Sequence, residues 1–560
     1  MALDKSITRL GVTAGLAGLV LTSACSSSSA GPRLPSCGAH GTQLILAVAQ
    51  YNSIDPATDS GCVTFPANTS PDTAEYLVLP WSAGGTPGSS TPFTLQAATP
   101  QAVIAAQLVA QFAPPPSSGV PSPRGPAAVT FDRFLRESAR AGRYSSPARS
   151  AGGDGSVSRA SLAGPPTVGS LRTFRVCANT ACSSFDNVGA VVRSVGAHIA
   201  IYVDTLAPSP GLTASDLDSL KGVFDTRLYP LDTLTFGHVS DIDSNTVVIV
   251  LMTNTVNKLV SKARCTSSGY IAGFFFPADV APGISTNYNN GEIFYSIVAD
   301  SNATLSCAHK PSDVNNVTPV TFTHEFQHMI NFVEHVLVKN ANSEEGWLDE
   351  GLSKYAEEVA GRSFGDNAHF SQFAIGDVYD AYQYLGATGT SPLLIPEDTG
   401  SLAEVGASWL FTRYIVDQFG DSLPGRLVRT SFTGAGNVQA QTGQSFAQTV
   451  SRWALANWVS DLSGFSAPSE LQYTAWHFRS TYSNLHSQDP TDFPLAYPLV
   501  PTVSAGNAVT LSGKLWSGSG EYVRAVQAPN GAAFTLHLSG AGGTAVSPAV
   551  IPRLVVLRVR

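Results

Sequence analysis

The chain has few charged residues and no excess of positive charge. Asp, Glu, Lys and Arg make up 13% of its 560 residues, and the formal net charge is −9. Nucleic-acid binding requires a basic surface that neutralises phosphates, so this balance argues against nucleic acid as a partner. Low charge, combined with abundant Ser, Thr, Gly and Pro, is instead typical of an exported protein.

Apolar runs long enough to span a bilayer are also missing. The run Leu10 to Leu21 follows Lys5 and Arg9 and is shorter than the roughly 20 residues of a membrane-spanning helix, which predicts a targeting segment. The run leads into Leu21-Thr22-Ser23-Ala24-Cys25, which resembles the lipobox of a bacterial lipoprotein signal. The resemblance implies cleavage before Cys25 and a lipid anchor at the cell envelope. Ordinary secretion is the alternative.

Closely spaced Cys-x-x-Cys pairs do not occur, which argues against a metal site built from cysteines. With Cys25 set aside, six of the seven cysteines remain, and an even number in an exported chain predicts three disulfides. Six cysteines allow fifteen connectivities, of which pairing between sequence neighbours is the simplest. The six are Cys37, Cys62, Cys177, Cys182, Cys265 and Cys307.

A His-Glu-x-x-His sequence lies inside an apolar run at His324 to His328. A helix advances about 100° per residue, so the two histidines lie on one face and can bind one metal ion. Catalytic zinc takes three protein ligands and leaves a fourth position for water, whose proton Glu325 can accept as general base. The motif predicts zinc-dependent hydrolysis without a covalent intermediate. A buried helix with structural histidines is the alternative.

The residues after His328 bear on the third ligand. Metzincins continue as His-Glu-x-x-His-x-x-Gly-x-x-His, but here Asn331 and Glu334 occupy the Gly and last His positions. His335 lies about 10 Å farther along the same helix, too far for the same ion. No Gly or Pro interrupts Thr321 to Lys339. We therefore expect the helix to continue, and the third ligand to come from a second helix packed against it.

The segment Gly346 to Glu358 is predicted to be that second helix, because its apolar residues recur at helical spacing. A glutamate near the start of this helix would face back toward the histidine pair. Glu344 and Glu345, in the polar turn just before the helix, are rival ligands.

Together these segments resemble the gluzincin clan of zinc peptidases, and more closely the hyicolysin-type peptidases. The resemblance rests on His-Glu-Phe-Gln-His-Met-Ile-Asn-Phe at His324 to Phe332 and on Trp-Leu-Asp-Glu-Gly-Leu-Ser at Trp347 to Ser353. The similarity extends from about Phe174 to Leu462, and it is looser at Gly406 to Phe411 and Asp417 to Gly420. The resemblance implies an α+β, zincin-type catalytic domain, a Zn²⁺ cofactor, Glu350 as third ligand, Glu325 as base and a protein or peptide substrate.

The family pattern leaves the oxyanion donor unassigned. Related peptidases often place a Tyr just before the Gly of a later helix, where its hydroxyl stabilises the tetrahedral oxyanion. Here Ala403-Glu404-Val405 precede that Gly. Four downstream residues with a hydroxyl or ring N–H are candidates: Tyr379, Tyr382, Tyr384 and His369.

Two apolar runs upstream of the motif, Tyr270 to Phe276 and Glu292 to Val298, are predicted strands. In zincins, the edge strand beside the active-site helix pairs with the substrate backbone. If the first run is that edge, Gly273 and Phe274 bind substrate, and a polypeptide is favoured over a small molecule. Alternatively, the phenylalanines of this run only fill the core.

The segment Asp241 to Asn245 places oxygen ligands at alternating positions, as calcium loops do. The Gly and the closing Glu of an EF-hand are missing, since Thr246 and Met252 stand at those positions. We interpret this segment as a turn that leads into a strand, and calcium as a second candidate ion.

A chain of this length is expected to contain several domains. Short β-like runs between turn residues predict a small β-domain near each end, on either side of an α+β catalytic domain with a mixed β lobe and a helical lobe. The expected parts are a signal peptide (1–25), an N-terminal β-domain (26–113), a Pro/Ser/Gly-rich linker or prosegment (114–170), the zinc peptidase domain (171–482) and a C-terminal β-domain (495–560).

Within the linker, a short helix is expected around Phe131 to Ala141. The composition around it suits either a flexible linker or a cleavable prosegment. We hypothesise that the region before about Leu171 is removed on activation.

Three functions are consistent with the sequence. The first is an extracytoplasmic zinc endopeptidase. The alternatives are a zinc exopeptidase of the aminopeptidase type and a non-catalytic surface lipoprotein with a zincin-like core. A serine hydrolase is disfavoured, because Gly443-Gln444-Ser445-Phe446-Ala447 lacks the final Gly of Gly-x-Ser-x-Gly.

Overall fold

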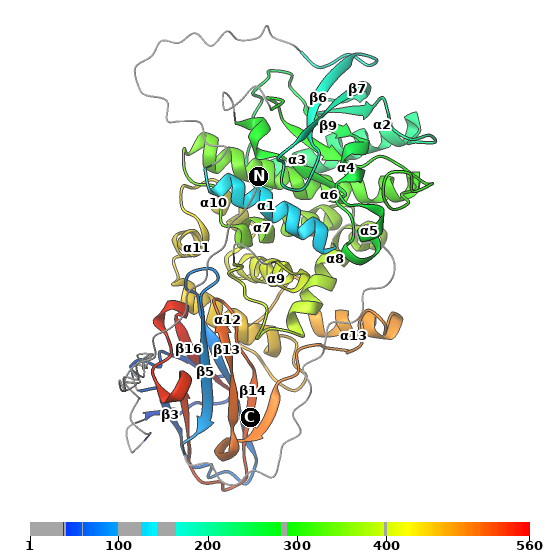
Figure 1. Cartoon of the computed structure of the whole chain (residues 1–560). Coiled ribbons are helices and arrows are strands. Elements are labelled where there is room, and N and C mark those ends of the chain that lie inside the picture. Colours follow the sequence, from blue (N-terminus) through cyan, green and yellow to red (C-terminus); the bar gives the residue numbers. More distant parts are fainter. Residues whose placement is uncertain are drawn as a thin grey trace, which may run out of the picture.

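The computed structural model describes residues 37, 41–58, 60–98, 125–142, 164–281, 288–396 and 400–560. The expected signal peptide (1–25), with its lipidation site Cys25, lies outside these residues. Within the described ranges, no helix has both the length and the apolar character needed to cross a bilayer. The architecture is α+β, with a helical and mixed-sheet central region (residues 164–500) and a β-sandwich, and one separate helix lies against the central region (Figure 1).

A mixed six-stranded sheet forms one layer of the central region, in the order β10-β11-β9-β8-β7-β6. Strands β8, β9 and β11 run parallel, and the other neighbours are antiparallel. Every residue of β9 is buried, as expected for a central parallel strand covered on both faces. The bounds are β6 Leu171–Cys177, β7 Phe185–Val195, β8 Ile199–Asp204, β9 Val248–Met252, β10 Gly273–Phe275 and β11 Ile293–Ser296.

The edge strand β10 lies against α6 (Pro311–Phe332), which contains the His-Glu-x-x-His motif. The chain continues from α6 through one π-helical segment, η3 (Val333–Val338), so the helix runs on much as expected. Helix α7 (Gly346–Ser363) packs on α6, and α8 and α9 pack on α7. The remaining helices of the region are α2 Ala214–Val223, α3 Tyr229–Thr235, α4 Asn254–Lys258, α5 Lys262–Ser268, α8 Asn367–Leu385, α9 Leu402–Phe419, α10 Leu423–Val428, α11 Gly434–Thr442, α12 Phe446–Val459 and α13 Phe478–Gln488.

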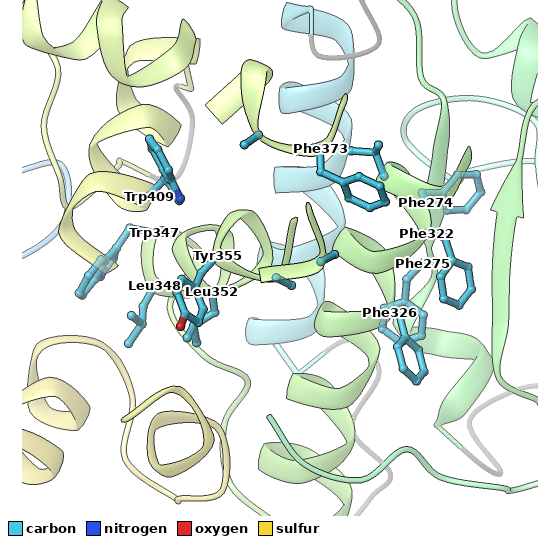
Figure 2. Packing of buried hydrophobic residues seen from close by; sticks show 14 of the residues in the cluster. Phe274, Phe275, Phe322, Phe326, Trp347, Leu348, Leu352, Tyr355, Phe373 and Trp409 are labelled. Atoms are coloured by element: carbon cyan, nitrogen blue, oxygen red, sulfur yellow. The ribbon is translucent and has the colours of Figure 1, made fainter. Parts of the chain in front are cut away.

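Aromatic and aliphatic side chains fill the space between these elements. Figure 2 shows two groups, one from β10 and α6 and the other from α7. The first group is Phe274, Phe275, Phe322 and Phe326, and the second is Trp347, Leu348, Leu352 and Tyr355. All eight side chains are buried, so the two helices that hold the predicted ligands are fixed to a common core.

The sandwich consists of two five-stranded sheets, β1-β3-β15-β5-β13 and β12-β14-β4-β16-β2. Both sheets contain strands from the two ends of the chain, and β4 pairs with β14 on one side and β16 on the other. The bounds are β1 Thr42–Gln43, β2 Tyr51–Ile54, β3 Cys62–Phe65, β4 Ala74–Ser82, β5 Ser90–Ala97, β12 Thr502–Ala505, β13 Thr510–Trp516, β14 Val523–Gln527, β15 Phe534–Ser539 and β16 Pro552–Arg558.

This topology corrects the expectation of separate β-domains at 26–113 and 495–560. Both segments contribute to a single apolar core, in which Phe65 stacks on Phe534 and Tyr76 packs at the edge of both rings. Either segment alone would leave open strand edges and only part of this core, so the two form one folding unit.

Short helical turns complete the described elements. They are η1 Phe224–Leu228, η2 Pro277–Val280, η4 Ser469–Leu471, η5 Gly506–Ala508, η6 Ala541–Gly543 and η7 Pro548–Val550. Three disulfides join sequence neighbours, which confirms the simplest predicted pairing and is compatible with an extracellular location. They are Cys37–Cys62, Cys177–Cys182 and Cys265–Cys307.

The helix expected in the linker is present as α1 (Pro126–Arg140). Pro126 occupies its first turn, where a missing N–H costs nothing. Its buried residues include Phe131, Leu135 and Ala139, which recur at every fourth position and form one face. This face lies across the central region against η2 and α7, over the two helices of the predicted zinc site (Figure 1).

Candidate metal centre

The two histidines of the motif point their Nε2 atoms at the same place. His324 and His328 lie one turn apart on α6, with their Nε2 atoms 3.2 Å apart. Ligands held at about 2.0–2.1 Å on a tetrahedral ion are about 3.3 Å from each other. The spacing of the two nitrogens therefore suits a shared ion.

Glu350 of α7 approaches the same place. Its Oε2 lies 3.7 Å from His324 Nε2, and its Oε1 lies 3.6 Å from His328 Nε2. Oε1 is buried and has no hydrogen-bond partner in the described part of the chain, which is the state expected of an oxygen that faces a cation. The structure thus brings together the three ligands expected from the sequence.

A fourth oxygen comes from α1. Asp132 Oδ2 lies 3.6 Å from His328 Nε2, and one atom each of Asp132, His324, His328 and Glu350 lie within 4.8 Å of one another. Burial disfavours a charge on Asp132, but the neighbouring Arg136 guanidinium holds the pKa of this carboxyl well below its usual range. Burial and the Asp132 carboxylate raise the pKa of Glu350 well above its usual value. A divalent cation would relieve this repulsion between the carboxylates.

Further carboxylates hold the other nitrogens of both rings. Glu357 Oε1 lies 2.8 Å from His324 Nδ1, and Asp349 Oδ1 lies 3.1 Å from His328 Nδ1. Asn331 in turn donates a hydrogen bond to Asp349. Ligating histidines usually present their second nitrogen to such a carboxylate, which fixes the ring and directs the other nitrogen at the metal. Two imidazoles and a carboxylate with this support fit a zinc ion.

The rival ligands point elsewhere. Glu344 is buried, accepts a hydrogen bond from the Gly434 N–H at 2.6 Å, and has its pKa raised to about 8 by that burial. Glu345 bonds to the indole N–H of Trp347 at 2.8 Å and pairs with Arg140 at 3.2 Å. Neither residue belongs to the four-residue cluster.

Glu325, the predicted base, is buried beside the cluster. Its Oε2 accepts hydrogen bonds from the Phe275 N–H at 3.0 Å and from the Arg136 guanidinium at 3.2 Å. Burial, followed by the charge on Asp132, raises the pKa of Glu325 to about 7. A carboxyl that titrates near neutrality is suited to general acid–base chemistry at that pH.

The cluster opens into a cavity of about 100 Å³ lined by α1, β10, α6 and α7. Gly273 and Phe274 both line this cavity, and β10 is the edge strand of its sheet, as expected for the substrate-pairing strand. The Phe274 ring, however, is buried and stacks on Tyr295 at 4.6 Å between centroids. Its side chain therefore belongs to the core, which was the alternative interpretation, and only the backbone of the strand remains for a substrate.

None of the four candidate oxyanion donors lines the cavity. The Tyr382 hydroxyl bonds to the backbone of Leu495. Tyr384 is buried in a stack with Trp453, Tyr379 packs on Phe493, and His369 pairs with Asp366. The donor stays unassigned.

A buried lysine that the sequence analysis missed does line the cavity. Lys354 Nζ lies 2.7 Å from Asp380 and 3.2 Å from Asp377, and all three side chains are buried. The lysine lies one turn after Glu350 on α7, so it shares a face with that ligand. Glu357 lies two turns after Glu350 on the same face of α7. Helical spacing could therefore have predicted that both Lys354 and Glu357 lie near the site.

The candidate calcium segment also forms a cluster. One oxygen each from Asp241, Asp243 and Glu292 lie within 4.8 Å of one another. Asn245 uses its side-chain oxygen to accept the Val247 N–H at 2.7 Å instead. The Arg172 guanidinium lies 3.5 Å from Asp243, so a side-chain cation already balances part of the negative charge of this cluster. Calcium binding here stays a prediction.

Comparison with known proteins identifies no family for this chain. The chain matches no protein-family model, and no curated protein matches it.

Proposed function

We propose that this protein is a zinc-dependent endopeptidase that acts outside the cytoplasm, anchored to the cell envelope through Cys25 or secreted. One observation carries the proposal. His324, His328 and Glu350 converge at ligand spacing, with carboxylates behind both imidazoles and a glutamate of raised pKa beside them.

The protein groups have distinct roles in peptide hydrolysis. A zinc ion held by the three ligands would polarise the peptide carbonyl and lower the pKa of a water molecule to about 7. Glu325 accepts the proton of that water and passes it to the leaving nitrogen. The Phe275 N–H holds Oε2 of Glu325 at 3.0 Å, so that Oε1 is left to carry the proton.

The substrate class follows from the position of β10. An edge strand presents unpaired backbone groups, and an extended peptide can pair with them whatever its side chains are. This favours an endopeptidase over the exopeptidase alternative. The non-catalytic alternative draws on one observation, namely that none of the four candidate oxyanion donors lies at the cavity.

The decisive experiment compares Glu325→Gln with the unchanged protein for zinc content and casein cleavage. Because α1 lines the cavity, both proteins carry a site-specific protease sequence within residues 99–124 and another within 143–163, so that α1 can be released before the assay. Zinc should be retained, since the ligands remain, while cleavage falls by about 10²-fold or more with the loss of the base.

Glu470→Gln is the control, because it makes the same chemical change at a residue that bonds to Tyr51 and that neither belongs to the four-residue cluster nor lines its cavity. Equal casein cleavage by Glu325→Gln and the unchanged protein would exclude the proposed mechanism.

A further inference from the structure

We infer that Asp132 is a displaceable fourth metal ligand, through which helix α1 keeps the centre latent until that helix is removed. The inference rests on the proposed function. Its support is three separate contacts that α1 makes with the centre, each at a position that hydrolysis needs.

The first contact occupies the position of the water. Catalytic zinc sites keep one position open, whereas structural sites fill all four with protein ligands. Asp132 Oδ2 lies 3.6 Å from His328 Nε2, as near as the 3.6 Å from Glu350 Oε1 to the same nitrogen. With Asp132 in place the cluster has four protein ligands and is closed.

The second contact engages the base. Arg136 is buried, and its guanidinium bonds to Asp132 Oδ1 at 2.7 Å and to Glu325 Oε2 at 3.2 Å. One residue thus holds the fourth ligand and the base together. While this pairing lasts, the carboxylate of Glu325 is tied to α1.

The third contact covers the edge strand. The Phe131 ring packs on Phe274, with 5.1 Å between centroids, and Arg136 also donates to the carbonyl of Phe275 at 3.4 Å. The cavity that remains beside β10 is about 100 Å³, whereas ligand pockets are typically about 300–1,000 Å³. A polypeptide cannot pair with β10 while α1 lies there.

The helix is attached in a way that permits its removal. α1 is a single helix of 15 residues, and within the described ranges no disulfide or strand pairing ties it to its neighbours. Isolated helices of this length are marginal in water, so α1 depends on the docking contacts. Residues 143–163, which follow it, are rich in Ser, Ala, Gly and Arg, and contain Arg143, Arg149 and Arg159.

The sandwich limits what can be removed. Strands β2 to β5 precede α1 in the sequence but pair with strands from the C-terminal part of the chain. A cut before Leu171 would therefore leave them bound in the two sheets. The hypothesis that everything before about Leu171 is removed is therefore restricted to the removal of α1. Cleavage on both sides of α1 frees the helix alone, and the sandwich keeps its strands.

The test uses the full-length chain loaded with Co²⁺ and titrated with azide, a small anion that binds metal positions not taken by protein. Visible absorption of the cobalt reports azide binding without any turnover. Asp132→Ala should bind azide at least about tenfold more tightly than the unchanged chain, a difference of about 1.4 kcal/mol. Asp132→Asn, which keeps the shape of the side chain, serves as the second variant.

Thr130→Ala is the matched control, because Thr130 lies on the exposed face of α1 and bonds only to its own helix at Pro126. It should behave like the unchanged chain. Release of α1 by the two introduced cuts should give the unchanged chain the azide affinity of Asp132→Ala and raise its casein cleavage.

The outcomes separate the two ideas. If every form binds one Co²⁺ ion but azide affinity is the same with and without Asp132, the latency inference is wrong and the zinc site stands. If no form binds one ion per chain, the proposed function fails and the inference fails with it.

Discussion

Helices α7 and α1 each bring a carboxylate to the same two histidines, but the two helices are held very differently. α7 is packed among α6, α8 and α9, and the side chains around Glu350 on it are almost all buried. α1 lies over the centre against α7 and η2, and its outer face is exposed at residues such as Thr130. Glu350 and Asp132 lie equally close to His328, so the comparison teaches that the packing of its helix, and not its distance, would decide how permanent each proposed ligand is.

The largest effect is expected at the permanent ligand. Glu350→Ala should lower zinc affinity by more than about 100-fold, which exceeds the usual cost of losing an outer-sphere partner. Asp132→Ala should lower it much less, because α7 still holds Glu350 beside the two histidines and a water molecule can take the position of Asp132. Competition with a chromophoric chelator measures both affinities. Equal losses of zinc affinity in the two variants would show that Asp132 is as permanent a ligand as Glu350.

The next effect concerns the docking of α1. Arg136→Gln leaves the Asp132 and Glu325 carboxylates buried without a cation, and breaking a buried pair costs about 3–5 kcal/mol. Arg140→Gln, on the same helix, removes a partly exposed pair with Glu345 and should cost at most about 1 kcal/mol. Hydrogen exchange of the α1 amides measures how much each variant weakens the docking of α1. Protection in α7 should stay unchanged in both variants.

The surface under α1 should respond to pH. Asp279 lies in η2, which α1 contacts, and burial raises the pKa of Asp279 to about 6. A raised pKa means that the folded state binds the proton more tightly, so the stabilisation is complete below about pH 4 and is lost as pH rises to about 6. A shift of about two units corresponds to about 3 kcal/mol.

Asp279→Asn should therefore be more stable than the unchanged chain at pH 7, relative to the same comparison at pH 4. Thermal unfolding at the two pH values measures the difference. A constant difference across this pH range would contradict the assignment to Asp279.

The smallest effect is expected behind the histidines. Asp349→Asn keeps the shape of the side chain but removes the charge beside His328 Nδ1. Zinc affinity should fall by about 10- to 100-fold, the usual cost of losing a carboxylate that orients a ligand. Isothermal titration with Zn²⁺ measures the change. An unchanged affinity would mean that the position of His328 is set by packing alone.

Spacing along the sequence predicted that the two histidines lie together. It could not predict which residues from distant parts of the chain lie beside them. His324 and His328 are one turn apart, so helical periodicity was enough to place them together. Periodicity predicted a second helix with a glutamate near its start, but the choice of Glu350 came from the resemblance of Trp347 to Ser353 to the gluzincin motif. Asp132 precedes the motif by a long stretch of chain, and its only local signal is the four-residue spacing to Arg136.

The same distinction explains the error in the sandwich. The strands at each end of the chain were recognisable from their own alternation and turns, and β12 to β16 all lie within the expected C-terminal β region at 495–560. Nothing in the local pattern of β4 indicates that β14 and β16 will lie on either side of it. Pairing between strands so distant in sequence follows from the shared core, which local propensity does not encode.

The interleaved sheets also impose an order on biogenesis. β4 has no sheet neighbours until β14 and β16 have left the ribosome, and β2 and β5 likewise pair only with strands from the end of the chain. These three strands therefore wait, unpaired, while the whole middle of the protein is made. Exposed strands that wait for distant partners are slow to find them and prone to aggregate. Binding of these first strands by an export chaperone would protect the newly made chain until its last residues arrive.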